Sequence, residues 1–108
     1  MVARVTLAEI DAVRMSVARA VERFEESVIP ELQQEPGYEG CYVLTTPEGK
    51  ALAITFWADD EAAERSLASG LYAAQVDKFV TLMRTPPGRE TYEVSIADAP
   101  TLSPSVRR

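Results

Sequence analysis

Hydrophobic residues follow a helical period in the first third of the chain. From Asp11 onward, apolar side chains recur every three or four positions, at Val13, Val17, Val21, Phe24 and Val28. This spacing predicts an amphipathic helix. We expect Asp11 to be its N-cap, because a carboxylate there can accept from the free N–H groups of the first turn. Pro30 has no N–H, so it must kink this helix or begin a separate last turn.

Four shorter segments show the composition of β-strands: residues 3–7, 38–46, 50–58 and 89–97. The two central segments are joined by the turn Pro47-Glu48-Gly49, which predicts a β-hairpin. Both of these segments are apolar at odd and even positions. A sheet with one wet face would alternate more clearly, so we expect both faces to be covered.

A second, broken helix is predicted between the hairpin and the last strand. Residues 58–69 are acidic and then alanine-rich, Gly70 interrupts them, and an apolar stripe resumes at Tyr72, Val76, Phe79, Val80 and Met83. The predicted class is therefore α+β, a ferredoxin-like βαββαβ domain over residues 1–97 with an antiparallel four-stranded sheet. Residues 98–108 are rich in Pro, Ser and Thr and are expected to form a mobile C-terminal tail.

Composition narrows the class of partner. The chain has 108 residues, the size of one domain, and a net charge of −6 with scattered basic residues. Nucleic acid is therefore not expected as a partner, because phosphate binding needs clustered Lys and Arg. No apolar run is long enough to span a membrane, and the chain begins without a signal-peptide core, so we expect a cytoplasmic protein. Cys41 is the only cysteine and is expected to be a small buried hydrophobe.

Three segments together resemble one known family. Residues 30–32 and 35–40 read Pro-Glu-Leu and Glu-Pro-Gly-Tyr-Glu-Gly; a strand ends at Trp57 and is followed by acids and alanines; and residues 86–94 read Pro-Pro-Gly-Arg-Glu-Thr-Tyr-Glu-Val. In order and spacing, these segments resemble antibiotic-biosynthesis-monooxygenase-like proteins of the dimeric α/β-barrel superfamily. The resemblance implies a homodimer whose two sheets face each other, which would cover the second apolar face.

The resemblance also implies a choice between chemistries. Some members of the family degrade haem through a histidine ligand, and this chain has no histidine, so we expect no haem degradation and no metal or cofactor. Cofactor-free oxygenases of the family carry an asparagine four residues before the tryptophan; the residue here is Ala53, and the chain has no asparagine. The implied function is a small-molecule-binding dimer, either a cofactor-independent monooxygenase of aromatic or quinone-type substrates or a non-catalytic accessory or ligand carrier.

The candidate pocket residues for a small aromatic ligand are Trp57, Tyr72, Tyr42, Phe24 and Arg84. Trp57 has two interpretations: it packs in the core between sheet and helices, or it stacks on a flat ligand. Tyr72 follows Gly70, where a break between helical pieces can open a cleft. The acidic cluster Asp59, Asp60, Glu61 and Glu64 fits a helix start better than a metal site.

Overall fold

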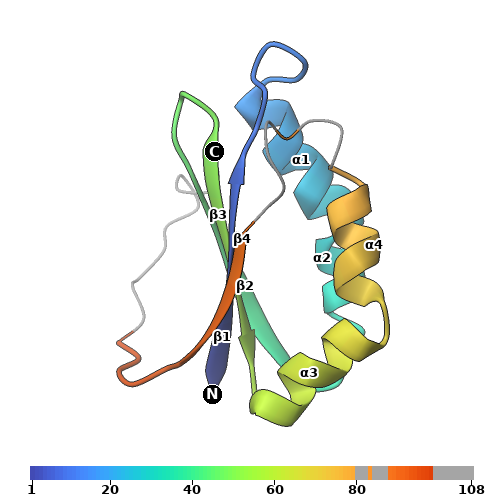
Figure 1. Ribbon diagram of the computed structural model, residues 1–108, viewed down its shortest axis with the longest axis vertical. Helices are drawn as coiled ribbons and strands as arrows, with labels where there is room; N and C mark the ends of the chain where they lie inside the picture. Colours follow the sequence, from blue (N-terminus) through green and yellow to red (C-terminus); the bar gives the residue numbers. More distant parts are fainter. Residues whose placement is uncertain (80–82, 84–87, 99–108) are drawn as a thin grey trace.

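The computed structural model describes residues 1–79, 83 and 88–98. The elements run in the order β1 (Val2–Glu9), α1 (Val17–Ser27), α2 (Ile29–Leu32), β2 (Tyr38–Thr45), β3 (Lys50–Trp57), α3 (Asp60–Ala68), α4 (Leu71–Asp77) and β4 (Gly88–Glu93). The strands form one antiparallel sheet in the order β2-β3-β1-β4. All helices among the described residues lie on one side of this sheet (Figure 1). The predicted α+β, ferredoxin-like fold is confirmed, with α3 and α4 as the two pieces of the broken helix.

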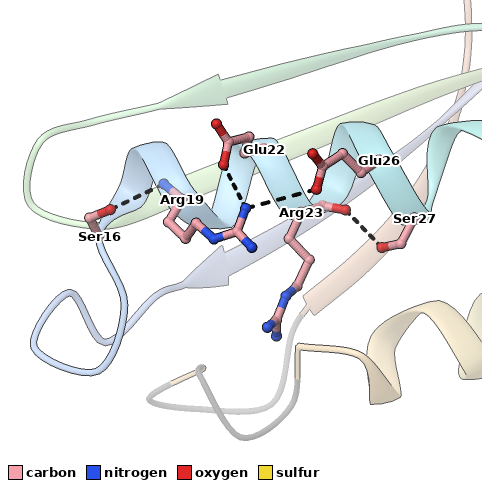
Figure 2. Close-up of polar contacts among 6 residues, drawn as sticks. All are labelled: Ser16, Arg19, Glu22, Arg23, Glu26 and Ser27. Carbon is pink, nitrogen blue, oxygen red and sulfur yellow. Dashed lines mark hydrogen bonds and ion pairs between the residues drawn. The ribbon is translucent and has the colours of Figure 1, made fainter.

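The first helix begins later than its apolar period predicted. Ser16 is the N-cap, and its Oγ accepts from the backbone N–H of Arg19 at 3.1 Å (Figure 2). The predicted N-cap Asp11 is wrong: its carboxylate instead accepts from the N–H of Val13 at 3.1 Å, in the turn before the helix. Val13 is 91% exposed, so this first member of the apolar stripe lies outside the packed face.

Proline and glycine interrupt the helices where the sequence indicated. The N–H of Val28 donates to Phe24 O at the end of α1, and Pro30 lies in the first turn of the separate α2. Gly70 adopts a left-handed conformation with φ of 81° between α3 and α4. The predicted second apolar stripe extends to Val80, which lies outside the described residues together with 81, 82 and 84–87.

The last strand is shorter than predicted, because β4 pairs with β1 only over Gly88–Glu93. Of the expected tail, only Asp98 is described, and residues 99–108 lie outside the described part. Within that part, no helix is long and apolar enough to cross a bilayer.

The main core lies between the sheet and the helices. It contains Trp57, which has no exposed surface, together with Val2, Val28, Leu32, Ala62 and Ala63. The ring of Tyr38 meets the Trp57 ring edge-on, with 5.6 Å between centroids. This packing explains the Pro-Gly segment before β2: Gly37 approaches Ala62 so closely that a Cβ at position 37 would overlap the Cβ of Ala62.

The opposite face of the sheet carries no helix of the described residues (Figure 1). Side chains along a β-strand point alternately to the two faces of the sheet. The helix-free face therefore carries the residues that alternate with the cavity-lining ones along each strand. Leu7, Leu44 and Tyr92 lie there with 55%, 55% and 51% of their surface exposed. The helices of the described residues therefore cover only one of the two apolar faces.

Candidate functional site

A cavity of about 120 Å³ lies between the sheet and the helices. Its floor is formed by small side chains of the three longest strands, including Ala8, Ala51 and Ala53. Its roof consists of larger apolar groups from the helices and the segment after them, including Val21, Phe24, Val76, Phe79 and Met83. Small residues below and large residues above leave room because the alanines do not fill the space that longer side chains would occupy.

Side-chain contacts at both ends of α4 connect it to the rest of the domain. Tyr72, in its first turn, has its hydroxyl 3.2 Å from the Oγ1 of Thr6 on β1. At the other end, Lys78 Nζ donates to the carbonyl of Ser27 at 2.9 Å and pairs with Glu31 Oε1 at 2.6 Å. These contacts connect α4 to the sheet and to the α1–α2 junction, so they hold the roof over the cavity.

Few polar groups line the cavity, and several of them meet near β1 and α4. The polar residues of the lining are Arg4, Thr6, Thr45, Thr55, Tyr72 and Gln75. Two of their nitrogens, Arg4 Nε and Gln75 Nε2, are buried and have no hydrogen-bond partner among the described residues. An apolar pocket with a few converging polar groups is the usual form of a small-molecule site.

Arg4 is the centre of this polar end. It is only 3% exposed, and its guanidinium carbon lies 5.3 Å from the ring centroid of Trp57 and 5.5 Å from that of Tyr72. Its Nη2 donates to the carbonyl of Ala63 on α3. The guanidinium carbon of Arg89, on β4, lies 5.1 Å from the centroid of the same Tyr72 ring. The two arginines and two aromatic rings thus alternate from the core to the sheet edge.

Burial lowers the pKa of Arg4, and the positive charge of Arg89 lowers it further. A guanidinium nevertheless stays protonated in proteins. The cavity is therefore lined at one end by a cation that has lost most of its hydration. Sequence reasoning did not select Arg4. The available signal was a charged residue among apolar ones in a short strand, on the same face as Thr6 and Ala8.

The candidate pocket residues lie in different places. Phe24 and Tyr72 line the cavity. Trp57 does not line it but packs beside it in the core, where its indole N–H donates to Thr55 Oγ1 at 2.9 Å, and Thr55 does line the cavity. Trp57 thus occupies the core position next to the site.

Tyr42 does not line the cavity. It pairs with Ile54 and packs edge-on against Phe56, with 5.8 Å between ring centroids, on the helix-free face. Its neighbour Val43 faces the cavity, and alternation along the strand sends Tyr42 to the other side. Arg84 lies outside the described residues.

Other candidate chemistry is structural. Asp59 caps α3 by accepting from the N–H of Ala62 at 2.8 Å, as expected for an acidic helix start. Among residues 1–79, 83 and 88–98, no group of three or more His, Cys, Asp and Glu side chains could hold a metal ion. Burial raises the pKa of the Cys41 thiol to about 11, so it is protonated at neutral pH and a poor nucleophile.

Solved structures with the same fold include proteins of different activities. NE2512, a protein of unknown function from Nitrosomonas europaea, is 22% identical, with a TM-score of 0.72 over 93% of this chain and 94% of that one. The monooxygenase ActVA-Orf6 of Streptomyces coelicolor, solved with nanaomycin D, is 16% identical, with a TM-score of 0.71 over 93% and 92%. The haem degrader MhuD from Mycobacterium tuberculosis, solved with two haems bound, is 20% identical, with a TM-score of 0.70 over 92% and 100%.

At these identities the structures establish a shared fold and leave the activity open. No curated protein matches the chain. The family model described as antibiotic biosynthesis monooxygenase matches residues 4–78, which is more than half of the sequence. The match includes the cavity floor, the Gly37 turn, Trp57 and the roof helix α4. The chain therefore belongs to the antibiotic biosynthesis monooxygenase family.

Proposed function

We propose that this protein is a homodimer that binds a small aromatic compound in the cavity under α4 and oxidises it with O2, without metal or flavin. The observation that carries the proposal is the cavity itself: an apolar space whose few polar groups converge at one end. If side chains had filled the space between helices and sheet, an enzyme would have had nowhere to bind its substrate. Membership of the family supports the oxygenase class.

The volume of the cavity favours a one-ring substrate. Its 120 Å³ is close to the roughly 150 Å³ of an engineered apolar protein cavity that binds benzene. A phenol or hydroquinone of this size fits the space, and its hydroxyl can meet the hydroxyls of Thr6 and Tyr72. The apolar walls of the remaining surface exclude water from the ring.

A phenol can supply all the electrons that such a reaction needs. One oxygen atom of O2 forms a new ring carbonyl and the other leaves as water, while the ring loses one C–H and one O–H hydrogen and becomes a quinone. The protein's part is to orient the ring, to donate a hydrogen bond to its developing oxyanion through Tyr72, and to exclude water.

Oxygen consumption tests the oxygenase proposal directly. Purified protein is mixed with monocyclic phenols and hydroquinones, and O2 uptake and quinone absorbance are compared with the protein-free background. Val76→Phe fills the cavity, whereas Ala73→Phe adds the same ring on the exposed side of α4. We expect uptake above background that Val76→Phe abolishes and Ala73→Phe retains. Uptake unaffected by Val76→Phe would contradict catalysis in this cavity.

One observation favours a ligand carrier as the second candidate. Ala53, on the cavity floor, stands where cofactor-free oxygenases of the family are expected to carry asparagine, so this position offers no hydrogen bond to substrate or oxygen. If the protein is a carrier, aromatic ligands should quench the fluorescence of Trp57, the only tryptophan, and no O2 should be consumed.

The homodimer is supported by the helix-free face, where aromatic and aliphatic side chains lie uncovered over the sheet. A second copy placed face to face would bury them, and burial of apolar area drives association. We expect a solution mass of about 24 kDa, twice the 11.9 kDa of the chain.

A matched pair of variants tests this interface. Leu44→Lys places a charge on the helix-free face, and Val13→Lys places the same charge on an exposed apolar residue elsewhere; the two side chains are 55% and 91% exposed in the protomer. Light scattering should show a monomer for Leu44→Lys and a dimer for Val13→Lys. A wild-type protein that stays monomeric at all concentrations would contradict the proposal.

A further inference from the structure

We propose that Arg4, assisted by Gln75, binds an ionised oxygen of the ligand, so that the cavity selects aromatic compounds in their anionic form. This inference rests on the proposed function, because it assigns the ligand class of the same cavity. The shared chemistry is an oxyanion on a single ring, which a phenolate or an aryl carboxylate can provide.

The first support is the hydrogen bonding that the protein leaves incomplete. Arg4 Nε and Gln75 Nε2 are buried donors on residues that line one cavity, and neither has an acceptor within the described part of the chain. Buried donors in proteins are nearly always satisfied by protein, water or ligand. Two unsatisfied donors beside the same space indicate that an acceptor binds there.

The second support is the balance of charge around Arg4. Besides burial, the positive charge of Arg89 lowers the pKa of Arg4, whereas Tyr72 and, most weakly, Glu64 raise it. No carboxylate lies within ion-pair distance of Arg4 among residues 1–79, 83 and 88–98. The rings of Trp57 and Tyr72 stabilise the cation in part.

A nearly buried cation with a second cation nearby is stabilised most by an anion placed beside it. A protein with a net charge of −6 thus presents a positive, dehydrated end to its one-ring cavity. A neutral ligand would leave this charge unpaired. The same ring carrying an ionised oxygen would both pair the charge and accept the free hydrogen bonds.

A phenol whose colour reports its ionisation tests the inference. The probe is p-nitrophenol, which absorbs visible light strongly only as the phenolate. Its absorbance is titrated against pH at saturating protein. We expect the apparent pKa of the bound probe to fall by at least about one unit, which corresponds to a tenfold preference for the anion. An unshifted or raised pKa in the wild-type protein overturns the inference without any variant.

Variants locate the effect. Arg4→Met removes the charge at similar length and should abolish the shift, whereas Arg4→Lys should keep part of it, and Gln75→Leu should reduce it. The control Arg19→Met removes the same charge from the outer face of α1, where Arg19 pairs with Glu22 and Glu26 (Figure 2), and should leave the shift intact. A folded Arg4→Met protein that keeps the full shift would overturn the role of Arg4.

A second arm separates the two sources of the oxyanion. Benzoate and its neutral analogue benzamide are compared by quenching of Trp57 fluorescence. Tighter binding of benzoate by tenfold or more supports a carboxylate ligand, and a shifted nitrophenol without benzoate binding supports a phenolate ligand. If neutral rings bind as well as anions and O2 is still consumed, this inference fails while the proposed function stands. If anions bind more tightly but no O2 is consumed, the oxygenase function fails while this inference stands.

Discussion

Replacement of Gly37 by alanine should destabilise the fold by two separable effects. Gly37 has a φ of 83°, in the left-handed region that side chains disfavour, and a Cβ there would overlap the Cβ of Ala62. The backbone effect costs about 1–2 kcal/mol. Ala62 is 2% exposed on α3, so the overlap forces a shift in packed structure, which costs about 1–3 kcal/mol more.

Gly70 provides the matched control. Its φ of 81° is nearly the same, but a Cβ there would meet no atom within 4 Å. Gly70→Ala should therefore show only the backbone cost of about 1–2 kcal/mol. The difference between the two variants isolates the packing against α3.

Urea unfolding measures both variants, with Trp57 fluorescence and far-UV circular dichroism as probes at one fixed protein concentration. We expect Gly37→Ala to be less stable than Gly70→Ala by about 1–3 kcal/mol. Adding Ala62→Gly to Gly37→Ala should recover part of this difference, apart from the roughly 1 kcal/mol that a helical glycine costs. Equal destabilisation by the two alanine substitutions, with no recovery, would refute the proposed contact.

Three further predictions concern a helix cap, a thiol and the roof. Ser16→Ala should lower the free energy of unfolding by about 0.5–2 kcal/mol in urea titrations, because the first turn of α1 loses its acceptor, and Asp11→Ala should cost less. Burial raises the pKa of Cys41 from 9.0 to about 11, so between these pH values the folded state keeps a proton that the unfolded state loses. The urea concentration at the unfolding midpoint should therefore decrease as the pH rises from 9 to 11, and it should decrease less steeply in Cys41→Ala. Tyr72→Phe should lower the free energy of unfolding by about 0.5–1.5 kcal/mol, because the hydrogen bond to Thr6 is lost. An equal loss of stability in Thr6→Val, with no further loss in the double variant, would confirm that the two hydroxyls interact.

The elements of the fold were readable from local pattern. The apolar period of α1, the stop at Pro36-Gly37, the hairpin turn and the break at Gly70 all depend on residues close together in sequence. The start of α1 was misplaced because Asp11 and Ser16 are both good N-cap residues. The structure selects Ser16, because the packed stripe begins at Val17 and leaves Val13 in solvent.

The candidate site was only partly readable. Phe24 and Tyr72 lie beside the cavity, because each belongs to an apolar helical stripe that faces the sheet, and their contact with a ligand stays a prediction. Tyr42 was among the candidate pocket residues, although its strand position sends it to the helix-free face. Both faces of β2 and β3 carry apolar residues, so hydrophobic pattern alone could not assign their sides.

By itself, the sequence determined the order of helices and strands and the family, because these follow from short-range periodicity and from glycine and proline at turns. Only the tertiary structure decided that Arg4 lies against Trp57 and Tyr72 and shares one cavity with Gln75. Arg4 lies opposite Thr55 through the pairing of β1 with β3, and α4 folds back over both strands. Strand register and helix docking bring Arg4 to residues more than fifty positions away, and burial then removes most of the water from its charge.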